Sequence, residues 1–511
     1  MYPGTYAKTT PDKPAIIMAG SGKQLTYREL DEQSAKLARA LHDLGLRKGD
    51  VFAMLSDNQA ECLMIYWAAL RSGLYITAIN YHLTADEVGY ILTDCEAKVL
   101  FTSGSLVQLG QEVIEAAPRV QQHFSFGGEI PGYGSMEQLI ADAGEPLEEI
   151  PSGADMLYSS GTTGRPKGIK GALPDRNIDE PGNTLVALAT AFFGMTDETV
   201  YLSPAPVYHA APLRWCATVQ ALGGTVVMME RFDAEGMLEA IQRFGITATQ
   251  VVPTMFVRML QLPEETRGKY DHSTLKLCIH AAAPCPPEVK AKMIEWWGPV
   301  LVEYYASTEG AGMTIVTSQQ WLDKPGTVGK AALGIIRICD EEGRELPTGV
   351  PGSVYFERDE ETFEYHNSPD KTADSRHPDH PLWTTVGDIG YLDDDGFLFL
   401  TDRKAFMIIS GGVNIYPQEV ENVLALHPAV YDVAVIGVPD PEMGEQVKAV
   451  VQPRDGVEPS EGLAREIIDY VREHIAHFKA PRTVDFVDEL PRTPTGKLVK
   501  GKLRDAYAKR D

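Results

Sequence analysis

Short apolar runs alternate with helix-length amphipathic segments over most of this chain. From about residue 25, runs such as VFAML, KVLFT, TVVMME, ATQVVP and LKLCIHA are separated by segments such as TYRELDEQSAKLARALHDLG. A buried strand followed by an amphipathic helix is the repeating unit of a largely parallel sheet with helices on its faces. The alternation therefore predicts an α/β fold. At 511 residues the chain is too long for one ordinary core, so at least two folding units are expected.

The pattern changes near residue 340. The segments CDEEGRELPTGVPG and YLDDDGFLFL carry turn signals between short apolar runs, which predicts hairpins and a smaller β-rich unit. After TDRKAFM the sequence predicts a new α+β pattern: the helix PQEVENVLALH, the strands DVAVIGVP and EQVKAVVQP, and the helix EGLAREIIDYVREHIAH. We therefore expect a domain boundary at about 401–405.

Charge and cysteine usage narrow the function classes. With 72 acidic against 46 basic residues, the formal charge of −26 disfavours binding to nucleic acid or to anionic membrane surfaces. Six scattered cysteines without CxxC spacing suit reduced thiols in a cytoplasmic protein. The start of the chain lacks a signal-peptide pattern. The most apolar stretch, CLMIYWAALRSGLYI, is interrupted by Arg71 and predicts a core helix running into a strand, so no membrane insertion is expected.

The segment YSSGTTGRPKG, residues 158–168, is the strongest local signal of chemistry. Its glycines allow close approach of the backbone, and its hydroxyls and one lysine supply donors of the kind that a triphosphate requires. It is not a Walker A loop, because Pro166 stands where that motif needs glycine. Taken alone, the segment is also compatible with a flexible surface loop.

The same segment resembles the phosphate-binding signature of the adenylate-forming superfamily, which includes acyl-CoA synthetases, the adenylation domains of nonribosomal peptide synthetases and firefly-type luciferases. Further segments occur in the order and spacing of that family and span about two-thirds of the chain: APVYHAAP (205–212), HAAAPCPP (280–287), EYYASTEG (303–310), TTVGDIGYL (384–392), TDRKAFMIISGGVNIYPQEVE (401–421) and PRTPTGK (491–497). Chance does not account for the ordered set.

The resemblance implies a two-domain enzyme. An N-terminal AMP-binding domain, 1–401, would contain two α/β sheet subdomains and a β-rich subdomain, and a small mobile α+β domain, 406–511, would carry the catalytic lysine. The hinge between them would be Asp402, Arg403, Lys404 and Ala405. The family usually has Asp or Lys at the position of Ala405, so this chain departs from the family pattern at the hinge.

The resemblance also assigns roles to individual residues. Ser159, Ser160, Gly161, Thr162, Thr163 and Gly164 would wrap the β- and γ-phosphates of ATP together with Lys167, and Glu309 would hold Mg²⁺. The adenine and ribose would contact Ala281, Ala282, Ala283, Pro284, Glu303, Tyr304, Tyr305, Ala306, Ser307, Thr308, Asp388 and Arg403. The acyl pocket would contain His209, Ala210 and Ala211, and Gly411 and Gly412 would lie along coenzyme A. Lys497 would bridge the α-phosphate and the substrate carboxylate.

Each of these residues has an ordinary structural alternative. Taken alone, Glu309 is compatible with a cap at the start of a helix, and Asp388 with a turn residue after a strand. Arg403 and Lys497 are compatible with solvated surface positions. His209 is compatible with a core histidine bonded to the backbone.

We therefore expect an ATP-dependent acyl-CoA synthetase that uses ATP, Mg²⁺, coenzyme A and a small carboxylic acid. In many relatives the stretch at 281–283 begins with two glycines and position 306 is glycine, whereas this chain has alanine there, so the added methyl groups reshape the pocket floor and the family's chain-length rules do not transfer. Because Ala210 and Ala211 leave room on the other wall, we expect a medium-chain, branched or ring-bearing acid. One alternative is an adenylating enzyme that loads a carrier protein or an amine, and another is a non-catalytic nucleotide-binding regulator. The oligomeric state is left open, a homodimer being one candidate.

Overall fold

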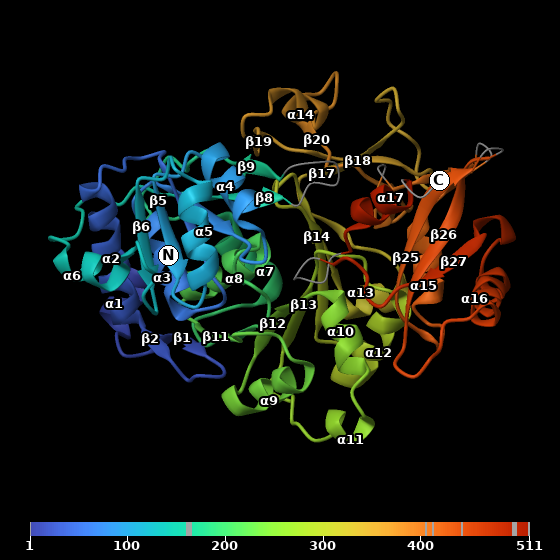
Figure 1. Ribbon diagram of the computed structural model, residues 1–511, viewed down its shortest axis with the longest axis horizontal. Coiled ribbons are helices and arrows are strands. Elements are labelled where there is room, and N and C mark those ends of the chain that lie inside the picture. Colours follow the sequence, from blue (N-terminus) through green and yellow to red (C-terminus); the bar gives the residue numbers. More distant parts are fainter. Residues whose placement is uncertain are drawn as a thin grey trace.

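The computed structural model of this chain describes residues 2–159, 166–403, 406–410, 413–440, 443–492 and 498–508. For Ser159, Asp402, Arg403, Asn414 and Ala508 it describes the backbone alone. Figure 1 shows a large body that contains the N-terminus and a smaller lobe, drawn in orange and red, that contains the C-terminus.

The larger of the two main sheets has nine strands, and its central strands are parallel. In spatial order they are β16 (Lys330–Leu333), β15 (Met313–Thr317), β14 (Leu301–Ala306), β13 (Leu277–His280), β12 (Ala248–Val251), β10 (Val200–Ser203), β11 (Thr225–Met228), β1 (Pro14–Met18) and β2 (Gln24–Thr26). The edge strands β15, β16 and β2 pair antiparallel with their neighbours.

The second main sheet has eight strands. In spatial order they are β19 (Glu364–Tyr365), β9 (Lys167–Lys170), β8 (Ala154–Ser159), β4 (Tyr75–Ile79), β3 (Val51–Leu55), β5 (Val99–Ser103), β6 (Gln122–Phe126) and β7 (Gly134–Ser135). Strands β8 and β9 form an antiparallel pair in which Ser159 faces Lys167. The 158–168 segment therefore crosses from one strand of this sheet to the next.

The helices pack on the two main sheets and, at the C-terminal end of the chain, on the sheet of the smaller lobe. They are α1 (Pro3–Thr9), α2 (Tyr27–Asp43), α3 (Ala60–Leu70), α4 (Ala85–Asp94), α5 (Val107–Ala116), α6 (Met136–Asp142), α7 (Thr184–Phe193), α8 (Ala210–Ala221), α9 (Ala234–Phe244), α10 (Pro253–Leu260), α11 (Glu264–Arg267), α12 (Pro287–Trp297), α13 (Ser318–Asp323), α14 (Pro369–Asp374), α15 (Pro417–Leu424), α16 (Glu461–His474) and α17 (Lys500–Ala508), with a 3₁₀ turn at His477–Lys479. Helix α2 begins with a capping box, in which Thr26 and Glu29 exchange hydrogen bonds with each other's backbone N–H.

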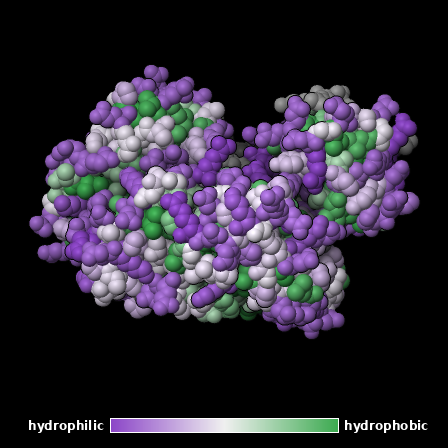
Figure 2. Space-filling view, turned by 90° about the horizontal axis from the view of Figure 1, so that it is seen from below, coloured by the Kyte–Doolittle hydropathy of each residue, from purple (hydrophilic) through white to green (hydrophobic). Residues whose placement is uncertain are grey.

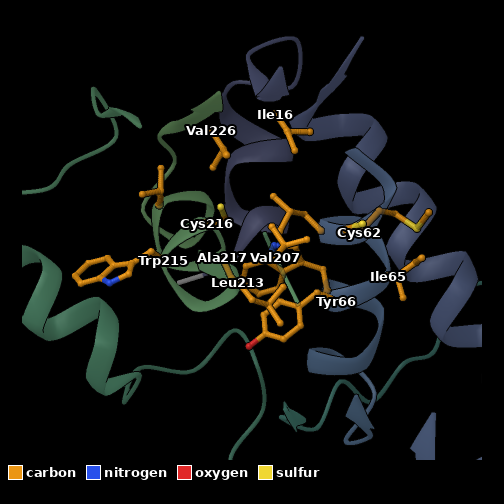
Figure 3. Packing of buried hydrophobic residues seen from close by; sticks show 14 of the residues in the cluster. Ile16, Cys62, Ile65, Tyr66, Val207, Leu213, Trp215, Cys216, Ala217 and Val226 are labelled. Atoms are coloured by element: carbon orange, nitrogen blue, oxygen red, sulfur yellow. The ribbon is translucent and has the colours of Figure 1, made fainter. Parts of the chain in front are cut away.

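Three hydrophobic cores lie against the two main sheets. The first lies between the two main sheets around α3 and α8, where Tyr66 points toward Leu213, and Cys62 and Cys216 belong to the same cluster (Figure 3). The second lies between the nine-stranded sheet and α9, α10, α12 and α13. The third lies between the eight-stranded sheet and α4 and α5. The two sheets with their buried intervening helices thus form one continuous body.

Two smaller sheets complete the chain. The first contains β17 (Ile335–Cys339), β18 (Gly352–Glu357), β21 (Asp388–Leu392) and β22 (Leu398–Arg403), with β20 (Trp383–Thr384) beside β18. The second contains β24 (Val413–Ile415), β23 (Ile408–Ser410), β26 (Gly444–Pro453), β25 (Val430–Asp440) and β27 (Thr483–Phe486). The predicted hinge, 402–405, begins inside the last strand of the first sheet, because Asp402 and Arg403 are the final two residues of β22, and β23 of the second sheet begins at Ile408. Lys404 and Ala405 lie outside the described residues, and the hinge stays a prediction.

The predicted fold class is confirmed, and the predicted helices of the C-terminal unit are present but end earlier than expected, at Leu424 and at His474. The α/β body has two main sheets, a β-rich unit begins at Ile335, and a small α+β unit lies at the C-terminal end. The hairpin in YLDDDGFLFL is the antiparallel pair of β21 and β22, and CLMIYWAALRSGLYI contains α3 followed by β4. All six cysteines are free thiols. Within the described ranges, no helix has the length and apolar character of a membrane span.

Candidate active site

A cleft of about 3150 Å³ lies where the body meets the C-terminal lobe. Its walls include residues that follow β10, β12, β13 and β14, part of the β8–β9 hairpin, and Gln418 and Lys500 of the lobe. Figure 2 shows the surface hollowed between the larger body and the lobe on the right. In open α/β sheets, ligands bind outside the carboxyl ends of the parallel strands. The cleft occupies that position on the nine-stranded sheet.

The β8–β9 hairpin brings Lys167 to the cleft. Lys167 lines it, and its Nζ lies 4.9 Å from the centre of the Tyr365 ring. Burial and the neighbouring ammonium of Lys371 lower the pKa of Lys167, while Glu309 acts in the opposite direction. A Cβ atom at Gly168 would lie 2.8 Å from Met156 Cε and 3.0 Å from the Tyr158 ring, so a larger residue there would displace these two side chains. The predicted phosphate contacts Ser160, Gly161, Thr162, Thr163 and Gly164 lie outside the described residues.

Glu309 lies in the connection between β14 and β15 and lines the cleft. The Tyr365 hydroxyl donates a hydrogen bond of 2.9 Å to Glu309 Oε1. The alternative that Glu309 caps a helix is wrong, because an antiparallel strand pair surrounds it. Next to it, Arg358 donates to the Gly310 carbonyl oxygen at 3.2 Å. The connection that carries Glu309 is therefore anchored at its side chain and at its backbone.

Asp388 is the first residue of β21 and is 6% exposed, although it lines the cleft. The Tyr305 hydroxyl donates to Asp388 Oδ2 at 2.6 Å. Arg403 is the residue opposite Asp388 in the β21–β22 pair. The two positions predicted to contact the ribose are thus neighbours in one sheet, 15 residues apart in sequence but paired in register.

The predicted adenine wall has two parts. Ala282, Ala283 and Pro284 follow β13 and line the cleft, whereas Ala281 is 3% exposed and packs in the core between the sheets. The second part is the end of β14 and the residues after it, all of which line the cleft: Glu303, Tyr304, Tyr305, Ala306, Ser307 and Thr308. Ala282 has a φ of 73°, a left-handed conformation that glycine adopts at lower cost.

A buried charged cluster lies beneath this wall. Lys290 Nζ on α12 is 2.5 Å from Glu303 Oε2, and Lys290 is 0% exposed. His280 Nε2 is 3.7 Å from the same oxygen. Burial, and then Lys290, lower the pKa of His280 well below its usual value, so the imidazole is neutral. Burial raises the pKa of Glu303, and Lys290 opposes that effect.

A second buried ion pair joins the two main sheets. Arg214 on α8 donates to both carboxylate oxygens of Asp155 on β8, at 2.9 and 2.6 Å, and Tyr66 adds a third hydrogen bond to that carboxylate. Burial alone would raise the pKa of Asp155, but the ion pair with Arg214 holds it below the usual value. The pair ties the strand that leads into the 158–168 segment to the helix that begins after His209.

His209 immediately precedes α8, is partly exposed and lines the cleft. Its ring contacts that of Tyr208 at 4.5 Å. Ala210 and Ala211 form the start of α8 and line the same wall. Deeper in the wall, Trp215 Nε1 donates to the Tyr304 hydroxyl at 3.4 Å. His209 therefore lies on a part of the cleft wall that also contains small and aromatic side chains.

Three further predicted residues, Gly411, Gly412 and Lys497, lie outside the described residues. The residues that flank 493–497 are described: Arg492 and Leu498 form an isolated antiparallel bridge, and both line the cleft.

The sequence interpretation missed four residues of this region. Three of them form hydrogen bonds with side chains more than 50 positions away, which no local pattern reveals: Tyr365, Asp155 and Arg214. Lys290 did leave a signal, because it shares a helical stripe with Met293, Ile294 and Trp297, all of which are buried.

Comparisons with known proteins identify the fold family. The AMP-binding enzyme family matches residues 5–364, and the AMP-binding enzyme C-terminal domain matches residues 419–497. Fatty acid--[acyl-carrier-protein] ligase ScoC of Streptomyces coeruleorubidus is 31% identical over 98% of this chain and 95% of its own length. Feruloyl-CoA synthase of an Amycolatopsis species is 32% identical over 99% of this chain and 98% of its own length. The ATP-bound structure of MatB from Rhodopseudomonas palustris superposes with a TM-score of 0.84 at 29% identity, covering 99% of each chain.

The fold and these matches define the class as an AMP-forming ligase. The chain belongs to the AMP-binding enzyme family, and the predicted membership of the adenylate-forming superfamily is confirmed.

Proposed function

We propose that this chain is an ATP-dependent acyl-CoA synthetase. In the first half-reaction the carboxylate oxygen of the acid attacks the α-phosphorus of ATP, and diphosphate leaves to give an acyl-adenylate. In the second, the thiol of coenzyme A attacks the acyl carbon, the thiol proton is released, and AMP leaves with the electron pair of the broken C–O bond.

One observation carries this proposal: three charged groups from distant segments line one cleft. Lys167 offers a cation for phosphate, Glu309 a carboxylate for a metal ion, and Asp388 a carboxylate for the ribose hydroxyls. These are the groups that a metal-bound nucleotide requires. Family membership, together with the ATP-bound structure to which the fold is similar, supports the same assignment.

The residues present fit Mg²⁺. Glu309 gives the cleft a hard oxygen ligand, and Mg²⁺ in nucleotide enzymes is held by one or two carboxylates together with substrate phosphates and water. When bound, the ion would offset the negative charge of the polyphosphate. Lys167 would add a second positive charge on the same side of the cleft.

Two half-reactions at one site call for two arrangements of the chain. We assign the N-terminal domain to 1–401, the hinge to 402–405 and the C-terminal domain to 406–511. In the first arrangement Lys497 would offset the repulsion between the carboxylate and the α-phosphate. In the second, rotation at the hinge would bring Gly411 and Gly412 to the pantetheine arm of coenzyme A. The cleft contacts of Arg492 and Leu498, which flank 493–497, support delivery of Lys497.

The acid is proposed to be medium-chain, branched or ring-bearing. The small side chains of Ala210 and Ala211 leave space in the wall next to His209, and the Trp215 and Tyr304 rings give that wall an apolar, flat surface. His209 would position the carboxylate between this pocket and the nucleotide.

An AMP-release assay across fatty, aryl and alicyclic acids tests the proposal. We expect AMP only in the presence of an acid, and faster release when coenzyme A is added. If adenylate forms but the thiol never accelerates turnover, the second half-reaction is refuted and the first is retained.

Loading of a carrier protein is a second candidate, because a fatty acid ligase of an acyl carrier protein is as similar to this chain as the coenzyme A ligase is. Preference for a phosphopantetheinylated carrier protein over free coenzyme A, compared at equal thiol concentration, would favour it.

A further inference from the structure

Tyr365 stands between the two charged groups at the polyphosphate end of the cleft. Its hydroxyl donates to Glu309 Oε1 at 2.9 Å, and its ring lies 4.9 Å beneath Lys167 Nζ. All three side chains line the cleft. They come from three segments, because Lys167 opens β9, Glu309 follows β14 and Tyr365 belongs to β19.

The backbone of Tyr365 is held in place from several sides. Tyr365 is paired with Ile169 in the antiparallel contact of β19 with β9, and its N–H donates to Thr372 Oγ1 at 2.9 Å. The N–H of the next residue, His366, donates to the Gly168 carbonyl oxygen at 2.8 Å. The tyrosine is therefore fixed to the same strand that carries Lys167.

Opposite charges sharing a cleft attract one another, and a direct ion pair would draw Lys167 and Glu309 away from a ligand. Within the described part of the chain no salt bridge joins these two side chains. Tyr365 instead satisfies each of them separately, because a hydroxyl stabilises one carboxylate oxygen and the electron-rich ring face attracts an ammonium group.

We propose that Tyr365 is a positioning residue that keeps Glu309 and Lys167 apart and directs the carboxylate to the metal ion and the ammonium to the phosphates of ATP. This inference rests on the proposed function, since it presumes that the cleft binds metal-bound ATP. It adds a residue that acts through Glu309 and Lys167 and need not touch the nucleotide.

The roles of the Tyr365 hydroxyl and of its aromatic ring can be tested separately by two substitutions. Tyr365→Phe removes only the hydroxyl, so the carboxylate loses its orientation, while the ring remains under Lys167. Tyr365→Leu removes both. A hydrogen bond to a charged group is worth about 10- to 150-fold in an equilibrium constant, and a cation–π contact about 2- to 30-fold.

The experiment is titration calorimetry of the full chain with ATP, once with excess Mg²⁺ and once with EDTA. In the wild type we expect Mg²⁺ to tighten ATP binding. In Tyr365→Phe, that tightening should shrink by about tenfold or more, with metal-free binding unchanged. In Tyr365→Leu, metal-free binding should also weaken, by about 2- to 30-fold.

Tyr75→Phe is the matched control. The Tyr75 hydroxyl donates to the Gly171 carbonyl oxygen at 2.7 Å, and its ring lies under Lys170, so the same change is made at the far end of β9. It should leave the effect of Mg²⁺ unchanged. An equal Mg²⁺ effect in wild type and Tyr365→Phe would overturn the positioning role alone. Absence of ATP binding in the wild type would refute the proposed function, and the inference with it.

Discussion

The buried pair of Lys290 and Glu303 offers a sharp test of how charge is accommodated beneath the adenine wall. Lys290→Met keeps the length of the side chain and removes its ammonium. The carboxylate of Glu303 then remains buried without its partner at 2.5 Å, and the neutral His280 does not replace that charge. Breaking a buried ion pair on one side costs about 3–5 kcal/mol of unfolding free energy. We expect a loss of that size at pH 7.5.

A double-mutant cycle measures the coupling. Urea unfolding can be monitored by tryptophan fluorescence, because the centre of the Trp321 ring lies 5.0 Å from Lys290 Nζ. Glu303→Gln alone should also destabilise, since it leaves an unpaired buried ammonium. The double variant Lys290→Met with Glu303→Gln should be more stable than Lys290→Met alone, because no buried charge remains.

The destabilisation caused by Lys290→Met should depend on pH, because it acts through the protonation of Glu303. Burial already raises the pKa of Glu303, and removal of Lys290 raises it further. A carboxyl group whose pKa is higher in the folded state favours folding when protonated, so the Lys290→Met defect should shrink as the pH falls toward 5. A variant within about 1 kcal/mol of wild type at pH 7.5, or a double variant no more stable than Lys290→Met, would refute this reasoning.

Three further predictions concern neighbouring residues. Ala282→Gly should raise the unfolding free energy or leave it unchanged, by about 0–1 kcal/mol, because it relieves the φ of 73°; a clear loss in urea unfolding would show that the alanine methyl contributes more through packing. Burial lowers the pKa of His280, so its imidazole is neutral in the folded chain but binds a proton in the unfolded chain at low pH. Below pH 6.5 this difference should lower the unfolding free energy by about 1.4 kcal/mol per pH unit. His280→Leu should reduce that slope, and an identical slope would contradict the assignment. Asp388→Asn should weaken ATP binding by about tenfold or more, measured by calorimetry, and leave the KM for the acid, measured by steady-state kinetics, near its wild-type value. An unchanged affinity for ATP would show that the proposed ribose contact is wrong.

Local sequence patterns were sufficient to predict the strands and helices that form the layers of the fold. Every residue of β3, β5 and β12 is buried, because parallel strands between helices are covered on both faces. The acidic turn with glycine in YLDDDGFLFL predicted the β21–β22 hairpin, because turn chemistry acts over a few residues. These features depend on near neighbours, which a single sequence contains.

The cleft was only partly predictable. Motifs located Lys167, Glu309 and Asp388, and the structure brings them to one cleft. The Asp155–Arg214 pair and the Tyr365–Glu309 contact depend on how distant segments pack, so no spacing in the sequence reveals them. The helix-cap alternative for Glu309 failed for the same reason, because the turn into β15 follows from sheet pairing.

The central claim is that this chain joins an acid to AMP with the help of Lys497. Acid-dependent exchange of labelled diphosphate into ATP measures that step directly and needs no acceptor thiol. With an acid found by the AMP-release screen, we predict exchange in the wild type and a loss of about 10²- to 10³-fold in Lys497→Ala. Undiminished exchange in Lys497→Ala would contradict the account.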